Sequence, residues 1–336
     1  GEWDGPAANL QDMVRAATGA NLPIVKAGEI DDEQLRETTA IILGNVGNNR
    51  RLLYLYSHYY IFADAVYPGD DGYEVRVVHD PWATGHNALV VGASSVAGAA
   101  AGVEALGEQI GEGADLTIGP LLLTKLSADM QRRYGGYATA ELGDKWMERV
   151  RATAENSIKT GAHTGLFGQI ASIGLRYQLT QREDYARAFV WLLQRAKEHR
   201  DSNPTTYGGP WGFDSDFSVY KVVPQWDVVE ECPALTDDER LEATKIIAEW
   251  VEQACAPKAA GTVGSTRVRH NHQTFPALGC YYTGNYFDKY YHAGEGKIWL
   301  RIADAAFTFQ STAFKGHEDC NGYQWLTLYH TMRYCL

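Results

Sequence analysis

Hydrophobic patterning changes once along this chain, near residue 120, and that change limits the folds it can adopt. Residues 1–118 alternate amphipathic stretches with short apolar runs, of which TAIILG (39–44), YEVRVVHDP (73–81) and NALVVGA (87–93) have the length and composition of strands. From residue 119 onward, apolar residues recur at helical spacing and no strand pattern intervenes. The sequence therefore predicts a small α/β domain over 1–118 and a mainly α-helical domain over 119–336.

Two further features of the first domain bear on its architecture. LPIV (22–25) is expected to form another short strand. Gly92, Gly98 and Gly102 follow an apolar strand, as in dinucleotide-binding folds, but the paired glycines and the later acidic residue of that motif are missing. The glycines therefore indicate close packing of a helix against a strand.

The second domain is predicted to consist of antiparallel helix hairpins. Capping-box patterns mark helix starts at Thr180 and Thr236 in this domain and at Asp31 in the first, each with Gln or Glu three residues later. A bundle, a solenoid and an (α/α) toroid all fit, although the lack of a fixed-period repeat weakens the solenoid, and we expect the toroid. The long connection 202–219 has the length of a functional loop. The expected helices span residues 139–160, 165–179, 182–200, 237–255, 275–293, 297–313 and 322–335.

Composition excludes several classes of protein. With 45% hydrophobic and 21% charged residues the chain can bury sizeable cores, and a net charge of −12 argues against nucleic-acid and anionic-membrane partners. No stretch is long and apolar enough to span a membrane. The aromatic share is 12%, including 20 Tyr and 9 Trp, which mildly favours a carbohydrate-binding protein because such rings stack on sugars.

The termini and the cysteines add weaker expectations. The chain opens with GEWDGPAANL rather than a basic and apolar signal peptide, which indicates processing or a piece of a longer chain, and it ends inside a helical pattern. Five cysteines without a CxxC pair argue against a disulfide framework and a structural zinc site. A bridge between Cys280 and Cys320 is the less favoured alternative. We expect no cofactor and no bound metal.

Two distant segments concentrate the residue types of a site that binds a sugar carboxylate and moves a proton. The first, 267–286, reads RVRHNHQTFPALGCYYTGNY, and the second, 315–334, reads KGHEDCNGYQWLTLYHTMRY. We expect them to face each other across one cleft. The candidate residues that they supply are Arg267, Arg269, His270, Asn271 and His272, and His317, Tyr323, Tyr329 and His330.

Cleavage of a uronate polymer by β-elimination needs three functions. The enzyme must neutralise the carboxylate beside the C5 proton, remove that proton and protonate the leaving oxygen. Asn271 and His272, at the start of a predicted helix, are suited to the carboxylate. Tyr329 is suited to the proton transfer.

This arrangement resembles the toroid-type polysaccharide lyases, in particular the alginate lyase and heparinase II/III-like families. Those families carry an Asn-His pair opening an inner helix and a later Tyr-His pair, which Asn271-His272 and Tyr329-His330 match. The resemblance implies that Asn271 and His272 neutralise the carboxylate and that Tyr329 acts as acid and base. Those lyases usually carry a β-sheet domain after the toroid, whereas this chain stops there, and its ring begins late.

The other predicted substrate-binding residues are distributed over the helical domain. Simpler structural roles remain open: Asn271 as a helix cap, His272 as a surface histidine, Tyr329 as a core residue, and Trp226 with Asp227 as packing. The full predicted binding set is Arg267, Arg269, His270, His163, Gln169, Trp226, Asp227, Tyr323 and His330.

Two other functions stay open. A toroid-type glycoside hydrolase would use paired carboxylates, and a non-catalytic glycan-binding protein would keep only an aromatic groove. In every case the expected partner is a carbohydrate, an acidic polysaccharide for the lyase. We expect a secreted or periplasmic protein, with its oligomeric state open. The carboxylate candidates are Asp214 with Asp216, and Glu318 and Asp319 with Glu230 and Glu231.

Overall fold

The chain divides into two compact units, Gly1–Ala140 and Glu141–Leu336. Unit 1 extends past the boundary expected after residue 118, because the strand Leu122–Lys125 pairs within its sheet. The computed structural model describes residues 1–110, 118–119, 121–134, 136–161, 163–202, 211–212, 214–265, 268, 271–312 and 321–336.

Unit 1 contains a four-stranded mixed sheet in the order β1-β3-β2-β4. β1 runs parallel to β3, whereas β2 is antiparallel to both β3 and β4. The three predicted apolar runs form β1 to β3, which confirms them as strands, but residues 22–25 form no strand. The strands span β1 (Ala40–Gly44), β2 (Tyr73–Val78), β3 (Ala88–Gly92) and β4 (Leu122–Lys125).

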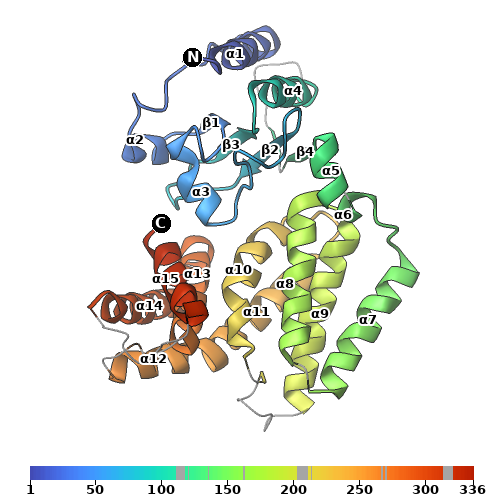
Figure 1. The fold of residues 1–336 in the computed structure, drawn as a ribbon, viewed down its shortest axis with the longest axis vertical. Helices are drawn as coiled ribbons and strands as arrows, with labels where there is room; N and C mark the ends of the chain where they lie inside the picture. The colour runs from blue at the N-terminus through green and yellow to red at the C-terminus, as the bar shows by residue number, and fades with distance from the viewer. Residues whose placement is uncertain are drawn as a thin grey trace. The chain divides into compact units, whose positions relative to one another are not determined.

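Helices cover both faces of this sheet (Figure 1). α4 (Val96–Gly107) packs on one face and α1 (Asp4–Thr18) packs against α4, whereas α2 (Asp32–Arg36) and α3 (Leu53–Ser57) pack on the other face. A Cβ at Gly102 of α4 would lie 2.9 Å from Val91 Cγ1 of β3, which confirms the predicted close packing of a helix against a strand. The unit is completed by the 3-10 turn Arg50–Leu52 and the short helices α5 (Ala128–Tyr134) and α6 (Gly136–Thr139).

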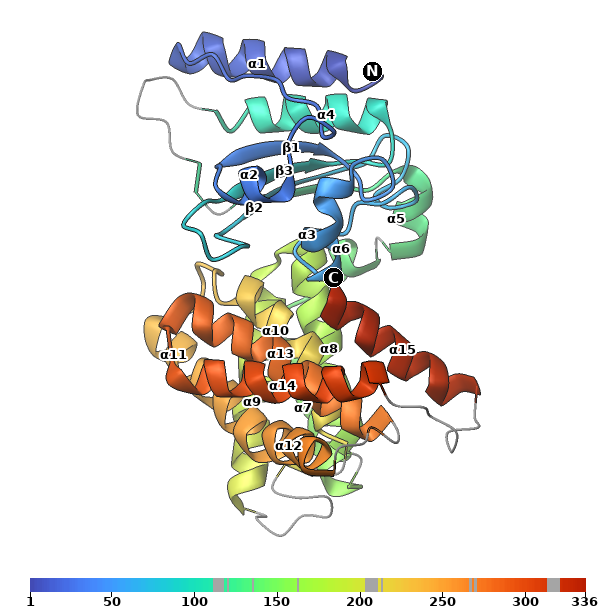
Figure 2. The ribbon, with the colours of Figure 1, turned by 90° about the vertical axis from the view of Figure 1, so that its left-hand side faces the viewer.

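Every described element of unit 2 is helical, and Figure 2 shows its last helices from the side. The capping box at Thr236 forms as predicted, and so does that at Asp31 in unit 1. Thr180 instead is the last residue of its helix, and its hydroxyl donates to the Arg176 carbonyl. The helices span α7 (Asp144–Lys159), α8 (His163–Thr180), α9 (Glu183–Ser202), α10 (Asp216–Val229), α11 (Asp237–Trp250), α12 (Ala256–Ser265), α13 (Asn271–Tyr291), α14 (Gly294–Thr312) and α15 (Asn321–Cys335), with the π-helical turn Val251–Cys255 between α11 and α12.

α10 lies between α8 and α13 and was not among the predicted helices (Figure 1). Nearly all of its residues are buried, from Asp216 to Val229, so it has no polar face and no amphipathic period. Pro224 and several β-branched residues lower its helix propensity further. Tertiary packing therefore determines this helix.

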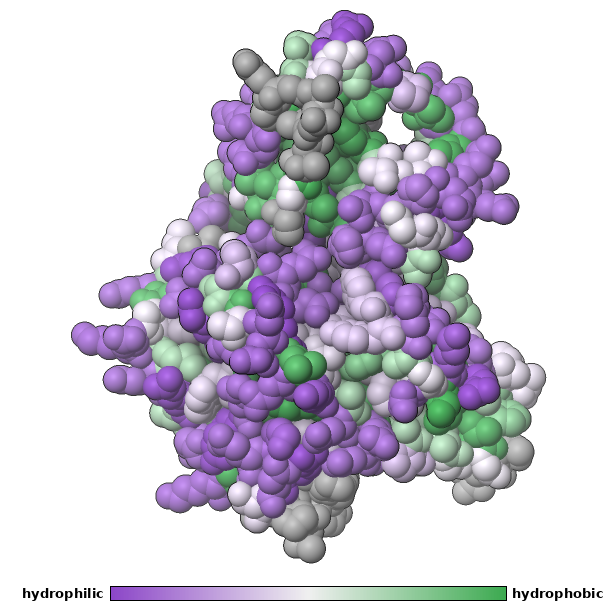
Figure 3. Space-filling view, turned by 180° about the vertical axis from the view of Figure 1, so that it is seen from behind, coloured by the Kyte–Doolittle hydropathy of each residue, from purple (hydrophilic) through white to green (hydrophobic). Residues whose placement is uncertain are grey.

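Hydrophilic residues make up most of the face drawn in Figure 3, with hydrophobic residues in smaller groups between them. Within the described part of the chain, none of the helices is apolar over a length that could cross a membrane.

Candidate functional site

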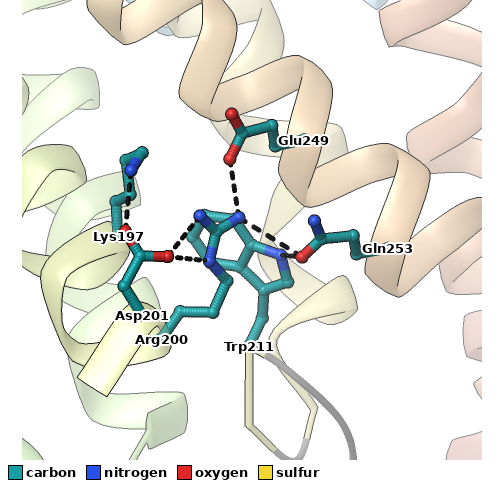
Figure 4. Close-up of polar contacts among 6 residues, drawn as sticks. All are labelled: Lys197, Arg200, Asp201, Trp211, Glu249 and Gln253. Atoms are coloured by element: carbon teal, nitrogen blue, oxygen red, sulfur yellow. Dashed lines mark hydrogen bonds and ion pairs between the residues drawn. The ribbon is translucent and has the colours of Figure 1, made fainter. Parts of the chain in front are cut away.

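A network between α9 and α11 fixes the chain just before α10 (Figure 4). The Arg200 guanidinium lies 4.6 Å from the Trp211 ring centroid and donates to Glu249 at 2.7 Å. Trp211 Nε1 donates to Gln253 Oε1 at 3.0 Å, and its ring stacks on Trp250. Trp211 is therefore held in place a few residues before the start of α10.

Two carboxylates stand at this entrance, one facing a lysine and the other a histidine. Asp214 has a left-handed backbone, with φ 60°, and its Oδ1 lies 3.6 Å from His272 Nδ1. Asp216, the first residue of α10, is fully buried and pairs with Lys258 of α12. We call Asp214, Asp216, Lys258 and His272 the carboxylate cluster.

The carboxylate cluster is not saturated with hydrogen bonds. Among the described residues, Asp214 Oδ1 and Asp216 Oδ2 are buried and accept none. Burial is the main cause that raises the pKa of both carboxyl groups, while Lys258 and His272 lower it. Buried acceptors without donors are uncommon, so these two oxygens need an explanation such as an ordered water, an ion or a ligand.

The start of α13 packs against α15. Asn271 is buried at the first position of the helix, and Thr274 Oγ1 lies 2.8 Å from Nδ1 of the buried His330. The ring of Phe275 meets that of His330 edge to face at 4.2 Å. These contacts join the two segments that the sequence singled out.

Tyr329 lies beside His330 on the exposed side of α15. The residue is 40% exposed, and the Arg333 guanidinium lies 5.2 Å from the ring centroid of Tyr329. Burial raises the pKa of Tyr282 to about 12, against the lowering effect of Arg333. Burial and the nearby Tyr329 likewise raise the pKa of Tyr220. Three phenols and a guanidinium therefore gather around α15.

Phe217 connects this group with the carboxylate cluster. Its ring meets His272 edge to face at 4.7 Å and stacks on Phe275 at 4.1 Å. Phe275 in turn contacts His330, which precedes Arg333 by less than one turn of α15. A continuous row of rings therefore runs from His272 to the residue next to Tyr329.

Trp226 and Asp227 lie at the other end of α10, inside the core. Trp226 is 0% exposed and donates from Nε1 to Thr244 Oγ1 and to Tyr286 OH, both at 3.1 Å. The Tyr290 hydroxyl donates to Asp227 Oδ1 at 2.5 Å. A sugar ring cannot stack on a fully buried indole, so the geometry favours the packing role left open for this pair.

Glu230 belongs to the same network. It accepts a hydrogen bond of 2.6 Å from the Tyr286 hydroxyl, and burial raises its pKa to about 8. The Lys289 ammonium donates to Tyr290 OH at 2.6 Å and lies 3.9 Å from Asp227 Oδ2. We call Trp226, Asp227, Glu230, Tyr286, Lys289 and Tyr290 the phenol network.

The remaining predicted residues divide into two groups. Gln169 donates to the Val150 carbonyl at 3.0 Å and so ties α8 to α7. The others lie outside what the structure describes: Arg267, Arg269, His270, His317, Glu318 and Asp319 as residues, and His163 and Tyr323 as side chains.

Lys258, Phe217 and Arg333 were not predicted as site residues. Arg333 follows Tyr329 by four positions, and that helical spacing could have identified it. Lys258 and Phe217 are brought in by tertiary packing, for which the sequence carries no local signal.

The described residues bear on metal binding and on the cysteines. No group of three or more His, Cys, Asp or Glu side chains among them is arranged to hold a metal ion. Cys280 is a buried free thiol, and Cys320, its suggested partner, lies outside the described residues. No family model, no curated protein and no solved structure matches this chain.

Proposed function

We propose that this chain is a polysaccharide lyase that cleaves a uronic-acid-containing polysaccharide by β-elimination. The observation that carries the proposal is the contact of Thr274 with His330, which brings the start of α13 to α15. Asn271 and His272 lie in the turn that begins with Asn271 and includes Thr274. Tyr329 lies next to His330. An amide, an imidazole and a phenol thus belong to one packed group, and elimination beside a carboxylate uses these groups.

In this proposal Asn271 and His272 bind the substrate carboxylate. The first turn of α13 adds a favourable dipole, because the N-terminus of a helix attracts negative charge. Neutralising the carboxylate makes the adjacent C5 proton easier to remove.

Tyr329 then moves the proton. The C5–H bond breaks, its electron pair forms the C4–C5 double bond, and the C4–O bond breaks. In this step Tyr329 acts as the phenolate: its oxygen accepts the C5 proton, and the phenol so formed donates that proton to the leaving oxygen. The Arg333 guanidinium, 5.2 Å from the ring centroid, would stabilise charge that develops on the phenol oxygen.

Hydrolysis by paired carboxylates has less support. Asp216 is fully buried and paired with Lys258, and Glu230 is held by the Tyr286 hydroxyl. Neither group has the exposure that a general acid needs to reach a glycosidic oxygen. The proposal also takes the antiparallel helices of unit 2 as part of an (α/α) toroid.

An activity screen over acidic polysaccharides, followed by ultraviolet absorbance, tests the proposal. Elimination leaves an unsaturated, absorbing uronate, whereas hydrolysis leaves none. With the active polymer, Tyr329→Phe should lower kcat by about 10²–10⁴-fold, because it removes the proton-transfer group, and should leave binding intact. Tyr291→Phe, at another exposed phenol, is the matched control.

Three outcomes would contradict the proposal. Tyr329→Phe could retain the wild-type kcat. Saturated reducing ends without new absorbance would indicate a hydrolase. Binding of a polysaccharide without turnover would indicate a glycan-binding protein.

A further inference from the structure

Lys221 is where the otherwise buried helix α10 reaches solvent. Within α10, which the structure describes in full, Lys221 is exposed, Phe217 is half-buried and all other residues are buried. An exposed lysine contributes little to the stability of a helix that is held by its packing between α8 and α13. Lys221 is therefore a candidate for a task at the surface of unit 2.

The Lys221 ammonium belongs to the group of rings around α15. It lies 5.4 Å from the ring centroid of Tyr220, and the Tyr220 ring meets that of His330 edge to face at 5.7 Å. His330 precedes Arg333 by three positions, so the two residues lie on one side of α15. The Arg333 guanidinium lies over the ring of Tyr329. Lys221 of α10 and Arg333 of α15 are therefore joined through this group of rings.

These two cations lie close enough to repel each other. Burial lowers the pKa of Lys221, and the charge on Arg333 lowers it further. No carboxylate among the described residues contributes to that shift. Acidic side chains are not scarce, because the chain has 42 of them and a net charge of −12. A ligand that brings a negative charge to Lys221 would relieve the repulsion.

α15 adds an exposed aromatic ring to the same region. Trp325 is 68% exposed and precedes Tyr329 by four positions, so the indole and the phenol lie on one side of the helix. An indole that can stack on a sugar ring, together with cations that can bind a carboxylate, matches the chemistry of a sugar acid. A small inorganic anion would use the cations and leave the indole without a role.

We propose that Lys221, Arg333 and Trp325 form a subsite for a part of the polymer next to the uronate that is cleaved. Lys221 binds the carboxylate of a second uronate, Arg333 adds positive potential, and Trp325 stacks on a sugar of the same chain. This inference rests on the proposed function, in which Tyr329 acts on the cleaved uronate. It narrows the substrate to polymers in which uronates occur close together along the chain.

Isothermal titration calorimetry in the Tyr329→Phe background, where substrate is not consumed, tests the subsite. The probes are tetrasaccharides of glucuronate, mannuronate and galacturonate, with cellotetraose as the uncharged probe. At least one acidic tetrasaccharide should bind more tightly than cellotetraose. Lys221→Ala should weaken that binding about tenfold and reduce its dependence on NaCl, because an ion pair with the ligand is lost. Lys221→Arg should retain most of the affinity.

The aromatic part of the subsite has its own variants. Trp325→Ala should weaken binding of the same tetrasaccharide about five- to tenfold, and Trp325→Phe should recover part of the loss. Lys297→Ala, at another exposed lysine of unit 2, is the matched control and should leave the affinity unchanged. All these side chains are exposed, so the variants should fold, which circular dichroism would check.

Kinetics supply a second readout with the polymer that gives absorbing product. Lys221→Ala should raise KM about tenfold and leave kcat unchanged, because the subsite binds substrate and transition state equally. A fall in kcat with an unchanged KM would contradict a binding role for Lys221.

Four other results would overturn the inference. The acidic tetrasaccharides could bind no more tightly than cellotetraose, or Lys221→Ala could retain the full affinity. Inorganic phosphate could compete as well as sodium glucuronate does, which would indicate a general anion site. Sedimentation velocity could show self-association that Trp325→Ala abolishes, which would assign the indole to an interface between copies. Failure of the proposed function looks different, because the chain would then bind acidic tetrasaccharides through Lys221 and form no absorbing product.

Discussion

The two ends of α10 carry similar acidic and basic residues, but the acidic groups differ in how completely they are hydrogen-bonded. At the N-terminal end, the carboxylate cluster has buried oxygens that accept no hydrogen bond among the described residues, next to a His272 side chain that is 43% exposed. At the C-terminal end, the phenol network supplies Asp227 and Glu230 with hydroxyl donors. Acids and cations occur at both ends, so composition does not separate them.

The two ends differ in whether their carboxylate oxygens have hydrogen-bond donors among the described residues. A network whose members bond one another mainly stabilises packing, whereas a cluster with unused acceptors and an accessible imidazole can still bind a ligand. We therefore expect substitutions in the phenol network to reduce stability and spare activity. Substitutions around His272 and Tyr329 should do the reverse.

The largest stability effect is expected for Trp226→Ala. The change removes a fully buried indole that stacks on Phe189 and leaves Tyr286 OH without its indole donor. It should lower the free energy of unfolding by about 3–5 kcal/mol, measured by urea denaturation and circular dichroism. At urea concentrations below its unfolding midpoint, the variant should keep the wild-type kcat/KM. A loss of activity as large as that expected for Tyr329→Phe would contradict a purely structural role for this end of α10.

The next largest effect is expected for the pH dependence of the free energy of unfolding. The pKa of Glu230 is raised from 4.5 to about 8, so the folded chain binds more protons than the unfolded chain between these values. The stability contributed by protonated Glu230 is complete below about pH 4.5 and is lost as pH rises through about 8. Between pH 5 and pH 9 we expect a loss of about 4 kcal/mol, because one pKa unit corresponds to about 1.4 kcal/mol.

Glu230→Gln should remove this dependence, because glutamine resembles the protonated acid and still accepts from Tyr286. Urea denaturation at pH 5 and pH 9, at opposite ends of the titration, would measure it. A variant that loses as much stability between these pH values as the wild type would show that Glu230 is not the responsible group.

The smallest effect is expected for Tyr290→Phe. The change removes the hydroxyl between Lys289 and Asp227 but keeps the ring. Hydrogen bonds to charged groups contribute about 1.5–3 kcal/mol, so the free energy of unfolding should fall by roughly that amount. Tyr291→Phe, at an exposed ring, should leave stability unchanged and thereby sharpen the contrast.

Local patterns predicted most of the elements. The strands β1 to β3 and the capping boxes at Asp31 and Thr236 depend on neighbours in the sequence, and the structure contains them. α10 was missed because burial on every side removes the amphipathic period. β4 was missed because its four residues carry too short a pattern to separate from a helix.

The candidate site was predictable only in part. The sequence singled out the segments of Asn271 and Tyr329, and the contact between Thr274 and His330 joins them. It could not identify Lys258 as the partner of Asp216, because the two residues meet only after α12 packs against α10. Local sequence likewise cannot distinguish a buried Trp226 from an exposed stacking platform.

The anchoring of Trp211 by Arg200 has a consequence for how this protein can vary. The stretch that joins these two residues begins and ends at fixed points, because the guanidinium and the indole are held together. Insertions or deletions between them would leave the start of α10 where it is, since lengthening a loop costs little free energy. The length of this connection can therefore vary while Asp214 and His272 keep their geometry.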